Sequence, residues 1–445
     1  EQGAKAGGAA AEACGFAATT VDLPAAEAEP LADAPLPVWD ARPTHGKGKA
    51  FVDLQHDVTA SDVSLAHREG FRSVEHLKRY TTLGMATDQG KTSNVIGLAL
   101  MARERQLSIP EVGTTRFRPP YTPVSLGALA GQGVGAHFRP LRRTAMHDWH
   151  IAQGAEMMAA GIWDRPRIYG KPGETVEQAY VREARHVRQA CGIADVSTLG
   201  KIDVQGPDAA EFLNRVYSNG FLKLPEGKAR YGLMLREDGF LWDDGTTWRL
   251  GETQFLMTTT TANAAPVLNQ LEFLLAAVWP ELKVAVTSVT EQWAAMAISG
   301  PKSRDVLAAA LDDIDMSGEA FPFMGVRRAT LDGVPVLVAR LSFSGELAYE
   351  VYVGAHYGEA AWQRILDAGK PFDLRPYGLE ALGTLRIEKG HVAGPELDGR
   401  TTAEDLGLAG MVSTKKHFIG SSMHQREGLT DPDRLKLVGF VSTDG

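Results

Sequence analysis

Two adjacent carboxylates, Asp243 and Asp244, are the side chains in this sequence with the clearest capacity for chemistry. A carboxylate can remove a proton, stabilise a developing positive charge, or accept paired hydrogen bonds from N–H groups. Two strand-like runs flank the nearby pair Asp238-Gly239, and an Asp-Gly pair between such runs is a strong signal for a β-hairpin. We therefore expect a hairpin to position both carboxylates.

The expected register of this hairpin separates the two carboxylates. A two-residue loop pairs Glu237 with Phe240, Leu235 with Trp242, Leu233 with Asp244, and Tyr231 with Thr246. Because side chains alternate along a strand, Asp244 shares a largely apolar face with Trp242 and Trp248, and Asp243 points to the opposite face. A buried carboxylate needs partners or a function, since its charge is costly to desolvate. The pattern leaves both roles open for Asp244.

Composition describes an ordinary globular chain. Its 445 residues are 44% hydrophobic and 23% charged, which is enough for two or three domains. The net charge of -9, with no block of Lys and Arg, argues against nucleic acid and anionic membranes as partners. No apolar run reaches the roughly 18 residues of a membrane span, and no signal peptide is visible. We expect a cytoplasmic protein.

Metal and disulfide chemistry find little support in the sequence. Cys14 and Cys191 are its only cysteines, and their separation suggests neither a disulfide framework nor a zinc site. His147 and His150 are three residues apart without a third ligand at suitable spacing, so we predict packing and no metal. The chain opens on Glu1 and stops just after a strand begins, and we expect both ends to be cut from a longer chain.

The elements that must position these side chains fall into four segments. Residues 1–48 contain an Ala-rich stretch, predicted to be a short helix, and a Pro-punctuated linker. Residues 49–122 are predicted to form a small helical domain, with a helix start near Thr59. Residues 123–428 mix helices and strands, and residues 429–445 start another domain.

A repeated pattern defines the large segment. GKIDVQGPDAAEFL reads as strand, Gly-Pro turn and helix, and AISGPKSRDVLAAAL repeats this order, which predicts an internal duplication. TVEQAYVREARHVRQACG has the apolar spacing of an amphipathic helix, and VRRATLDGVPVLVARLSFSGELAYEVYV supplies three further strands. We predict an α+β fold.

These motifs also carry a family resemblance. RYGLMLREDGFLWDDGTTWRL, together with CGIADVSTLGKIDVQGPDAAEFLN and SFSGELAYEVYV, resembles the folate-binding domain of the glycine-cleavage T-protein (aminomethyltransferase) family. VEHLKRYTTLGMATDQGKTSN and RPPYTPVSLGAL extend the resemblance, from about residue 49 onward, to the alpha subunits of heterotetrameric sarcosine oxidases. The resemblance implies a T-protein-like domain with duplicated strand-helix units, preceded by a small helical domain of the [2Fe-2S]-binding kind. It further implies that residues 1–48 are the tail of a missing nucleotide-binding domain and that a C-terminal barrel starts at residue 429.

The helical domain departs from the pattern that it resembles. The four cysteines expected for a [2Fe-2S] cluster fall on Asp53, Gln55, Asp88 and Ser93. Such clusters are held by thiolates. We therefore predict that this domain binds no iron–sulfur cluster.

The resemblance also assigns roles to particular side chains. It implies that Asp244 lies beside the reactive nitrogens of tetrahydrofolate and that Glu350, rather than the turn residue Glu346, binds the polar edge of the pterin. The folate-facing end of a strand falls on Thr258. Tyr231 shares the predicted face of Asp244 and is a candidate wall of the site.

The resemblance leaves two roles open for one basic residue. Arg386 lies in a helical motif shared with the family, where it either contacts folate or ties the helix to the sheet. At Leu382 the chain departs from the family, which carries a folate-binding arginine there. Folate is then held differently or less tightly.

The resemblance implies an oxidoreductase that oxidises sarcosine, acting on a CH–NH group with oxygen as acceptor. Sarcosine is oxidised on a beta subunit that carries flavin, and small gamma and delta subunits complete the assembly. FMN, FAD and NAD belong to the full complex and are not bound by this chain alone, apart from FMN contacts at a subunit interface. The iminium intermediate reaches this chain, where tetrahydrofolate yields glycine and 5,10-methylenetetrahydrofolate. With an ordinary pKa of about 3.9, Asp244 would be ionised and act as base or as electrostatic stabiliser.

Three alternatives remain at the level of sequence. A free-standing aminomethyltransferase would take its methylamine from a lipoyl carrier protein. A non-catalytic subunit would only scaffold a flavin amine oxidase. An oxidase for another N-methyl amino acid would keep all of these motifs.

Overall fold

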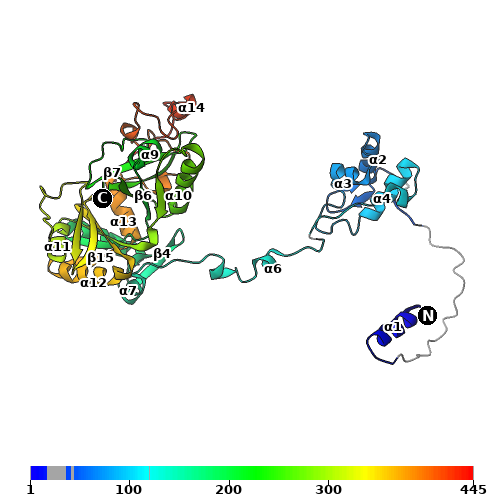
Figure 1. Cartoon of the computed structure of the whole chain (residues 1–445), viewed down its shortest axis with the longest axis horizontal. Coiled ribbons are helices and arrows are strands. Elements are labelled where there is room, and N and C mark those ends of the chain that lie inside the picture. Colours follow the sequence, from blue (N-terminus) through cyan, green and yellow to red (C-terminus); the bar gives the residue numbers. More distant parts are fainter. Residues whose placement is uncertain (1, 18–36, 42–44, 120, 444–445) are drawn as a thin grey trace. The chain divides into compact units, whose positions relative to one another are not determined.

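The structure is a computed structural model that describes residues 2–17, 37–41, 45–119 and 121–443. It divides into two compact units, Glu1–Gln132 and Gly133–Gly445 (Figure 1). The predicted Ala-rich helix is present as α1 (Gln2–Ala13), whereas half of the predicted Pro-punctuated linker lies outside the described residues. Within the described part of the chain, no helix is long and apolar enough to cross a membrane.

The first unit contains a small helical body. Its elements are β1 (Phe51–Asp53), β2 (Val58–Thr59), α2 (Ala60–Arg68), α3 (Val74–Thr81), α4 (Asn94–Arg105), α5 (Ile109–Val112) and α6 (Leu126–Ala130). Thr59 caps α2 as predicted, and its backbone N–H donates to Asp62 Oδ2 at 2.7 Å. Val63, Leu77 and Met101 are fully buried and join α2, α3 and α4 in one core.

Carboxylates stabilise turns at two of the four positions where the resemblance places cysteines. Asp53 Oδ2 accepts the backbone N–H of Gly84 at 2.8 Å. Asp88 accepts the N–H groups of Gly90 and Thr92 at 3.1 and 3.2 Å and the Thr92 hydroxyl at 2.7 Å. These hydrogen bonds, that of the Thr92 hydroxyl above all, lower the pKa of Asp88. Both side chains therefore have structural roles.

The second unit is built on two sheets. The five-stranded sheet is antiparallel, in the order β10 (Ala285–Ser288), β6 (Gly200–Gln205), β9 (Gln254–Thr259), β8 (Leu241–Arg249) and β7 (Lys228–Leu235). The six-stranded sheet has the order β12 (Val326–Leu331), β13 (Val334–Ala339), β14 (Ala348–Gly354), β11 (Trp293–Ser299), β5 (Cys191–Asp195) and β15 (Leu374–Pro376). A separate ribbon pairs β3 (Ala155–Ala160) with β4 (Trp163–Tyr169).

Helices cover the outer faces of these sheets. In Figure 1, α9 and α10 lie with β6 and β7, and α11 and α12 lie with β15. The α-helices are α7 (His147–Ala152), α8 (Val176–Gln189), α9 (Ala209–Val216), α10 (Ala264–Phe273), α11 (Ser303–Ala310), α12 (Gly358–Gly369), α13 (Leu379–Lys389) and α14 (Glu427–Thr430). The shorter turns are η1 (Gly135–His137), η2 (Leu274–Val278), η3 (Thr290–Gln292), η4 (Ala355–Tyr357), η5 (Lys370–Phe372), η6 (Gly394–Glu396) and η7 (Ala409–Met411).

The predicted duplication is present in the fold. β6 leads through Gly206 into α9, and β11 leads through Gly300 into α11. Both glycines have positive φ, 142° and 124°, and a Cβ at Gly206 would lie 2.1 Å from the carbonyl oxygen of Lys283. Glycine is therefore required at the same point of each repeated unit.

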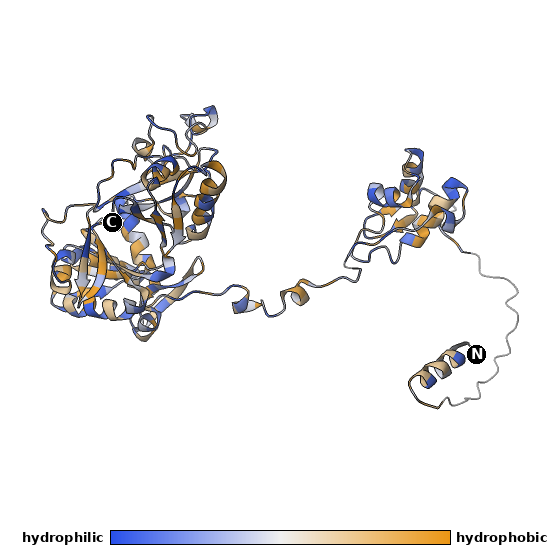
Figure 2. Ribbon diagram, viewed as in Figure 1, coloured by the Kyte–Doolittle hydropathy of each residue, from blue (hydrophilic) through white to orange (hydrophobic). Residues whose placement is uncertain are grey.

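The two sheets face each other across an apolar layer. Trp248 and Leu256 from the five-stranded sheet pack with Leu337 and Tyr352 from the six-stranded sheet. The rings of Trp248 and Tyr352 lie 4.6 Å apart between centroids, and Figure 2 shows orange, apolar strands inside this unit. Side chains that share a strand face with Trp248 or Tyr352 therefore point toward the layer between the sheets.

Candidate functional site

The pairing of β7 with β8 positions the central carboxylate. Leu233 lies opposite Asp244 and Tyr231 lies opposite Thr246, as predicted. Asp244 shares the face of β8 that carries Thr246 and Trp248, and Trp248 packs against the facing sheet. Asp244 therefore belongs to the face of β8 that looks toward the layer between the sheets.

The predicted two-residue loop of this hairpin is wrong. Leu235 pairs with Leu241 and not with Trp242, because a bulge shifts the register after Met234. The backbone N–H of Arg236 donates to Phe240 O at 2.9 Å, which leaves three residues in the loop. Its last residue, Gly239, has a φ of 91°, the left-handed conformation that ends a three-residue hairpin loop. The bulge restores the predicted register from Asp244 onward.

The more deeply buried carboxylate is Asp243, contrary to the expectation from the sequence. Its side chain is fully buried and accepts hydrogen bonds from the Thr260 hydroxyl at 2.6 Å and from Asn263 Nδ2 at 3.1 Å. Burial raises its pKa, and these hydrogen bonds oppose the rise. Asp243 connects β8 to the turn before α10, which is a structural role.

Asp244 is partly buried and, among the residues that the structure describes, has a single side-chain donor. The Tyr231 hydroxyl donates to Asp244 Oδ2 at 2.7 Å. Burial raises the pKa of Asp244 to about 7, the Tyr231 hydrogen bond opposes this rise, and repulsion from Asp243 adds to it. The expected ordinary aspartate pKa is therefore wrong. Near neutral pH this side chain can both accept and donate a proton.

Glu350 is the carboxylate of the facing sheet. It lies two residues from Tyr352 on the same face of β14, and the Tyr352 hydroxyl donates to Glu350 Oε2 at 3.1 Å. Burial raises the pKa of Glu350. In contrast, the carboxylate of Glu346 already has a partner, since it forms an ion pair with Arg188 at 2.9 Å.

Lys201 is a residue that the sequence analysis missed. It is fully buried on β6, where Nζ donates to Ser197 O at 2.7 Å and to Leu199 O at 3.0 Å and lies 5.4 Å from the Tyr352 ring centroid. Burial lowers its pKa to about 7, while attraction from Asp195 and Glu350 opposes the change. A lysine within the short strand GKIDVQ was the available signal, because lysine is rarely buried without partners.

Thr258 joins neighbouring strands close to this lysine. It pairs with Lys201 across β6 and β9. Its hydroxyl accepts the backbone N–H of Thr246 at 2.9 Å and donates to the Thr246 carbonyl at 3.0 Å. Thr258 therefore stabilises β8 at Thr246, two residues after Asp244, and acts on the carboxylate only indirectly.

Arg386 takes a structural position. Its guanidinium forms an ion pair with Glu396 at 2.7 Å and donates to His391 O at 3.1 Å. These contacts tie α13 to the loop that follows it, rather than to the sheet. Leu382, where the resemblance implies an arginine, packs in the cluster of α8 and α13.

His150 packs in the core, as predicted. The ring is fully buried, with Nε2 3.2 Å from Asp195 Oδ2 and Nδ1 2.8 Å from the Tyr169 hydroxyl. His147 Nδ1 lies 3.8 Å from Asp164 Oδ2. Both histidines therefore face carboxylates of their own unit.

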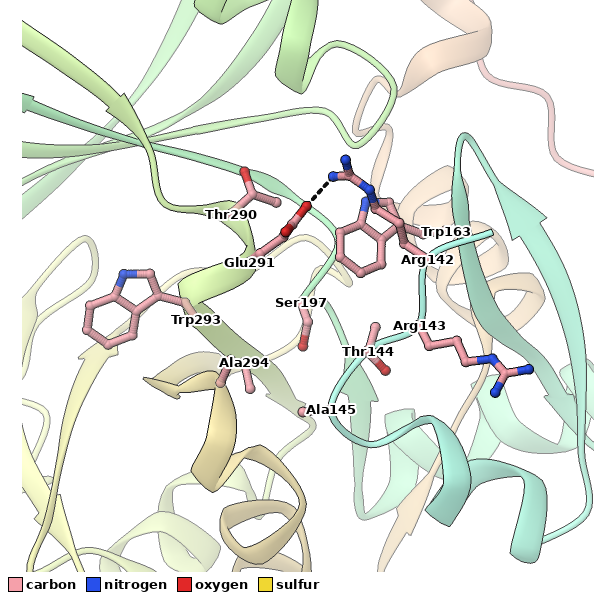
Figure 3. A pocket seen from close by; sticks show the side chains of 11 residues that line it. Arg142, Arg143, Thr144, Ala145, Trp163, Ser197, Thr290, Glu291, Trp293 and Ala294 are labelled. Carbon is pink, nitrogen blue, oxygen red and sulfur yellow. Dashed lines mark hydrogen bonds and ion pairs between the residues drawn. The ribbon is translucent and has the colours of Figure 1, made fainter. Parts of the chain in front are cut away.

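A cavity of about 430 Å³ lies beside another part of the sheets. Its wall includes Arg142, Trp163, Ser197, Glu291 and Ala294 (Figure 3). None of the five site residues predicted from the sequence lines it. The structure thus contains a second polar region besides the pair of Asp244 and Tyr231.

Models of known protein families match both units of the chain. The family model described as the GCVT N-terminal domain matches residues 146–416, and the one described as the Sarcosine oxidase A3 domain matches residues 47–132. An aminomethyltransferase from Streptomyces coelicolor is 35% identical over 313 residues, which are 68% of this chain and 78% of that protein. The chain belongs to the GCVT aminomethyltransferase family.

Within this family, the relationship extends over the helical unit as well. The sarcosine oxidase subunit alpha of Rhizobium meliloti is 53% identical over 94% of this chain, which confirms the predicted resemblance. This chain spans 42% of that relative. The crystal structure of glycine cleavage system aminomethyltransferase T from Bartonella henselae superposes with a TM-score of 0.55 at 25% identity, covering 64% of this chain and 73% of that one. The GCVT-like α+β fold is thereby confirmed.

Proposed function

We propose that this chain is the folate-binding part of a sarcosine oxidase alpha subunit. It binds tetrahydrofolate beside the layer between the two sheets and converts the iminium intermediate of sarcosine oxidation to glycine and 5,10-methylenetetrahydrofolate. The observation that carries this proposal is the hydrogen-bonded pair of Tyr231 and Asp244, whose carboxyl has a pKa of about 7. A group with this pKa suits proton transfer at neutral pH.

The side chains of the facing strands fit a tetrahydrofolate substrate. A pterin presents a planar edge of N–H donors, which a carboxylate can match with paired hydrogen bonds. Glu350 has one hydroxyl donor, from Tyr352, and so keeps acceptor capacity for such an edge. Because burial raises the pKa of Glu350, hydrogen-bond donors from a ligand would stabilise its ionised form. Glu346 is the weaker candidate, because Arg188 already holds it.

The proton balance of this reaction gives Asp244 a defined task. Attack by the two nitrogens of tetrahydrofolate forms two C–N bonds to the iminium carbon and breaks its bond to the glycine nitrogen. The two folate N–H protons are released, and the departing glycine nitrogen gains two. Ionised Asp244 can accept such a proton and, once protonated, return it, while Tyr231 orients the carboxyl. Water in place of folate would give formaldehyde.

The proposed assembly follows from the helical unit. A Sarcosine oxidase A3 domain at residues 47–132 supports an oxidase subunit over a free-standing aminomethyltransferase. We infer a beta subunit that carries flavin and oxidises sarcosine with oxygen as acceptor, together with small gamma and delta subunits. FMN, FAD and NAD chemistry belongs to the rest of that complex. The Thr258 hydroxyl stabilises β8, and the Arg386 ion pair stabilises the loop after α13. In this proposal neither side chain contacts the substrate.

Calorimetric titration of the purified chain with tetrahydrofolate tests the proposal. We expect stoichiometric binding that Glu350→Gln weakens. A chain that binds no folate would favour the scaffold role instead. Co-purification of a flavin-bearing partner with the complete protein tests the assembly, and its failure would favour the free-standing aminomethyltransferase.

A further inference from the structure

One ion pair lies across the cavity of about 430 Å³ and bridges two separately held segments. The guanidinium of Arg142 contacts the carboxylate of Glu291, as the dashed line in Figure 3 marks. Arg142 is fixed by its backbone, because its N–H donates to Ile162 O at 2.7 Å and its carbonyl accepts from Asp164 N at 2.9 Å. Glu291 comes from η3, which immediately precedes β11. The backbone segments that carry these two side chains are therefore held in place before any ligand arrives.

The rest of the wall is aromatic and small. The indole of Trp163 lies 5.8 Å from the Arg142 guanidinium, and Thr144 and Ser197 contribute hydroxyl groups. Ala294 takes little space. Figure 3 shows Arg143 pointing away from these side chains, so the charged groups turned toward the cavity are Arg142 and Glu291.

We propose that this cavity binds a small α-amino acid in its zwitterionic form. The ligand carboxylate would pair with Arg142, and its ammonium group would pair with Glu291 beside the indole of Trp163. A zwitterion inserted between the two side chains leaves neither charge unpaired. A simple anion would leave Glu291 without a partner, and a simple cation would do the same to Arg142.

Breaking the ion pair between Arg142 and Glu291 costs little free energy. The side chain of Arg142 is 50% exposed and that of Glu291 is 60% exposed. Ion pairs at such exposure contribute little to stability, because water screens them and two long side chains lose conformational freedom. The cavity volume leaves room for an N-alkyl group or a larger side chain next to Trp163.

The cavity adjoins the proposed folate site through Ser197, whose carbonyl accepts from Lys201, but neither Asp244 nor Glu350 lines it. The proposal rests on the proposed function only for the choice of probes, which are sarcosine and glycine. Tetrahydrofolate titrated into the same protein reports on the other site. Loss of amino-acid binding with intact folate binding would overturn this inference alone, and the reverse result would overturn the proposed function alone.

The experiment is a calorimetric titration of the full 445-residue chain with four probes. Sarcosine and glycine carry both charges, acetate carries the negative charge, and methylamine carries the positive charge. We expect both zwitterions to bind. Acetate and methylamine should bind more weakly by roughly tenfold or more, because each lacks one of the two charge-assisted hydrogen bonds. Acetate that binds as tightly as sarcosine would overturn the proposal, as would a failure of both zwitterions to bind.

Substitutions sharpen the test because they must act in opposite directions. Glu291→Gln should weaken the binding of sarcosine by roughly tenfold and strengthen the binding of acetate. Arg142→Gln should weaken the binding of sarcosine and strengthen the binding of methylamine. Asp332→Asn is the matched control, because it opens the exposed pair of Asp332 with Arg364, neither of which lines the cavity. Circular dichroism confirms folding of each variant. Unchanged sarcosine binding in both cavity variants would contradict the assignment.

Discussion

Carboxylates serve different purposes in the two units, and the hydrogen-bond donors around them account for the difference. Asp88 in the helical unit accepts two backbone N–H groups and one hydroxyl, and its pKa is lowered. Asp244 in the sheet unit accepts one side-chain hydroxyl, and burial raises its pKa to about 7. A carboxylate with several local donors stays ionised and stabilises a turn. One with few donors in a buried setting remains able to exchange a proton.

The same rule separates neighbouring residues within the sheet unit. Asp243 is more deeply buried than Asp244, yet Thr260 and Asn263 supply it with donors. Glu346 is paired with Arg188, whereas Glu350 has a single hydroxyl donor within the described part of the chain. Burial alone therefore does not identify a functional carboxylate. The number of donors already supplied by the chain is the better guide.

The largest expected effect is that of Asp244→Asn in the assembled complex. Asparagine keeps the shape and removes the exchangeable charge, and loss of a general base typically costs about 10²- to 10⁴-fold in rate. Flavin reduction by sarcosine should stay near its normal rate, while product shifts from methylenetetrahydrofolate toward formaldehyde. Rapid-quench product analysis measures this partition. Asp238→Asn, in the exposed hairpin loop, is the control, and an equal shift in both variants would contradict the role of Asp244.

The next effect concerns the two glutamates. Glu350→Gln should weaken tetrahydrofolate binding by about 1.5 to 3 kcal/mol, since a hydrogen bond to a charged group contributes about that much. Glu346→Gln should leave binding near normal, because this side chain already has Arg188 as its partner. Calorimetry on both variants decides. Equal losses would mean that donor number does not distinguish these carboxylates.

A smaller effect is expected for Asp88→Ala in the helical unit. Removing the side chain leaves the N–H groups of Gly90 and Thr92 without their acceptor, which should cost about 1 kcal/mol of local stability. Hydrogen exchange at these two amides should accelerate, with tetrahydrofolate binding unchanged. Weaker folate binding in this variant would give Asp88 a role that its hydrogen bonds do not explain.

A separate effect concerns the pH dependence of the free energy of unfolding of the sheet unit. The folded-state pKa of Asp244 is raised above its usual value of 3.8, so the folded protein binds more protons than the unfolded chain between about pH 4 and pH 7. Stability contributed by this group is present at low pH and is lost as pH rises through about 7. Asp244→Asn should therefore be more stable than the parent at pH 8, with the difference shrinking toward pH 4. Urea unfolding at both pH values measures this.

Much of the scaffold could be predicted from local patterns. The spacing of TVEQAYVREARHVRQACG predicts α8, and Thr175 with Gln178 forms its capping box. The repeated strand, Gly-Pro and helix order predicts β6 with α9 and β11 with α11. These features depend on neighbouring residues and on turn chemistry, which a sequence displays directly.

The features that were missed depend on contacts between distant segments. The bulge after Met234 lets Asp244 keep its partner Leu233 although the loop has three residues. The donors of Asp243 come from residues before α10, and the burial of Lys201 arises where β6 meets the facing sheet. The pKa of Asp244 follows from the same packing of two sheets. A pattern along one strand carries no information about donors on another.

The central claim is that Asp244 exchanges a proton near neutral pH and that Tyr231 sets where it does so. The most direct measurement is the pH dependence of methylenetetrahydrofolate formation in the assembled complex, for the parent and for Tyr231→Phe. The Tyr231 hydrogen bond lowers the pKa of Asp244, so its removal should shift the ionisation that governs product formation from about 7 to higher pH. A profile that is flat between pH 6 and 8, or one that Tyr231→Phe leaves unmoved, would contradict the account.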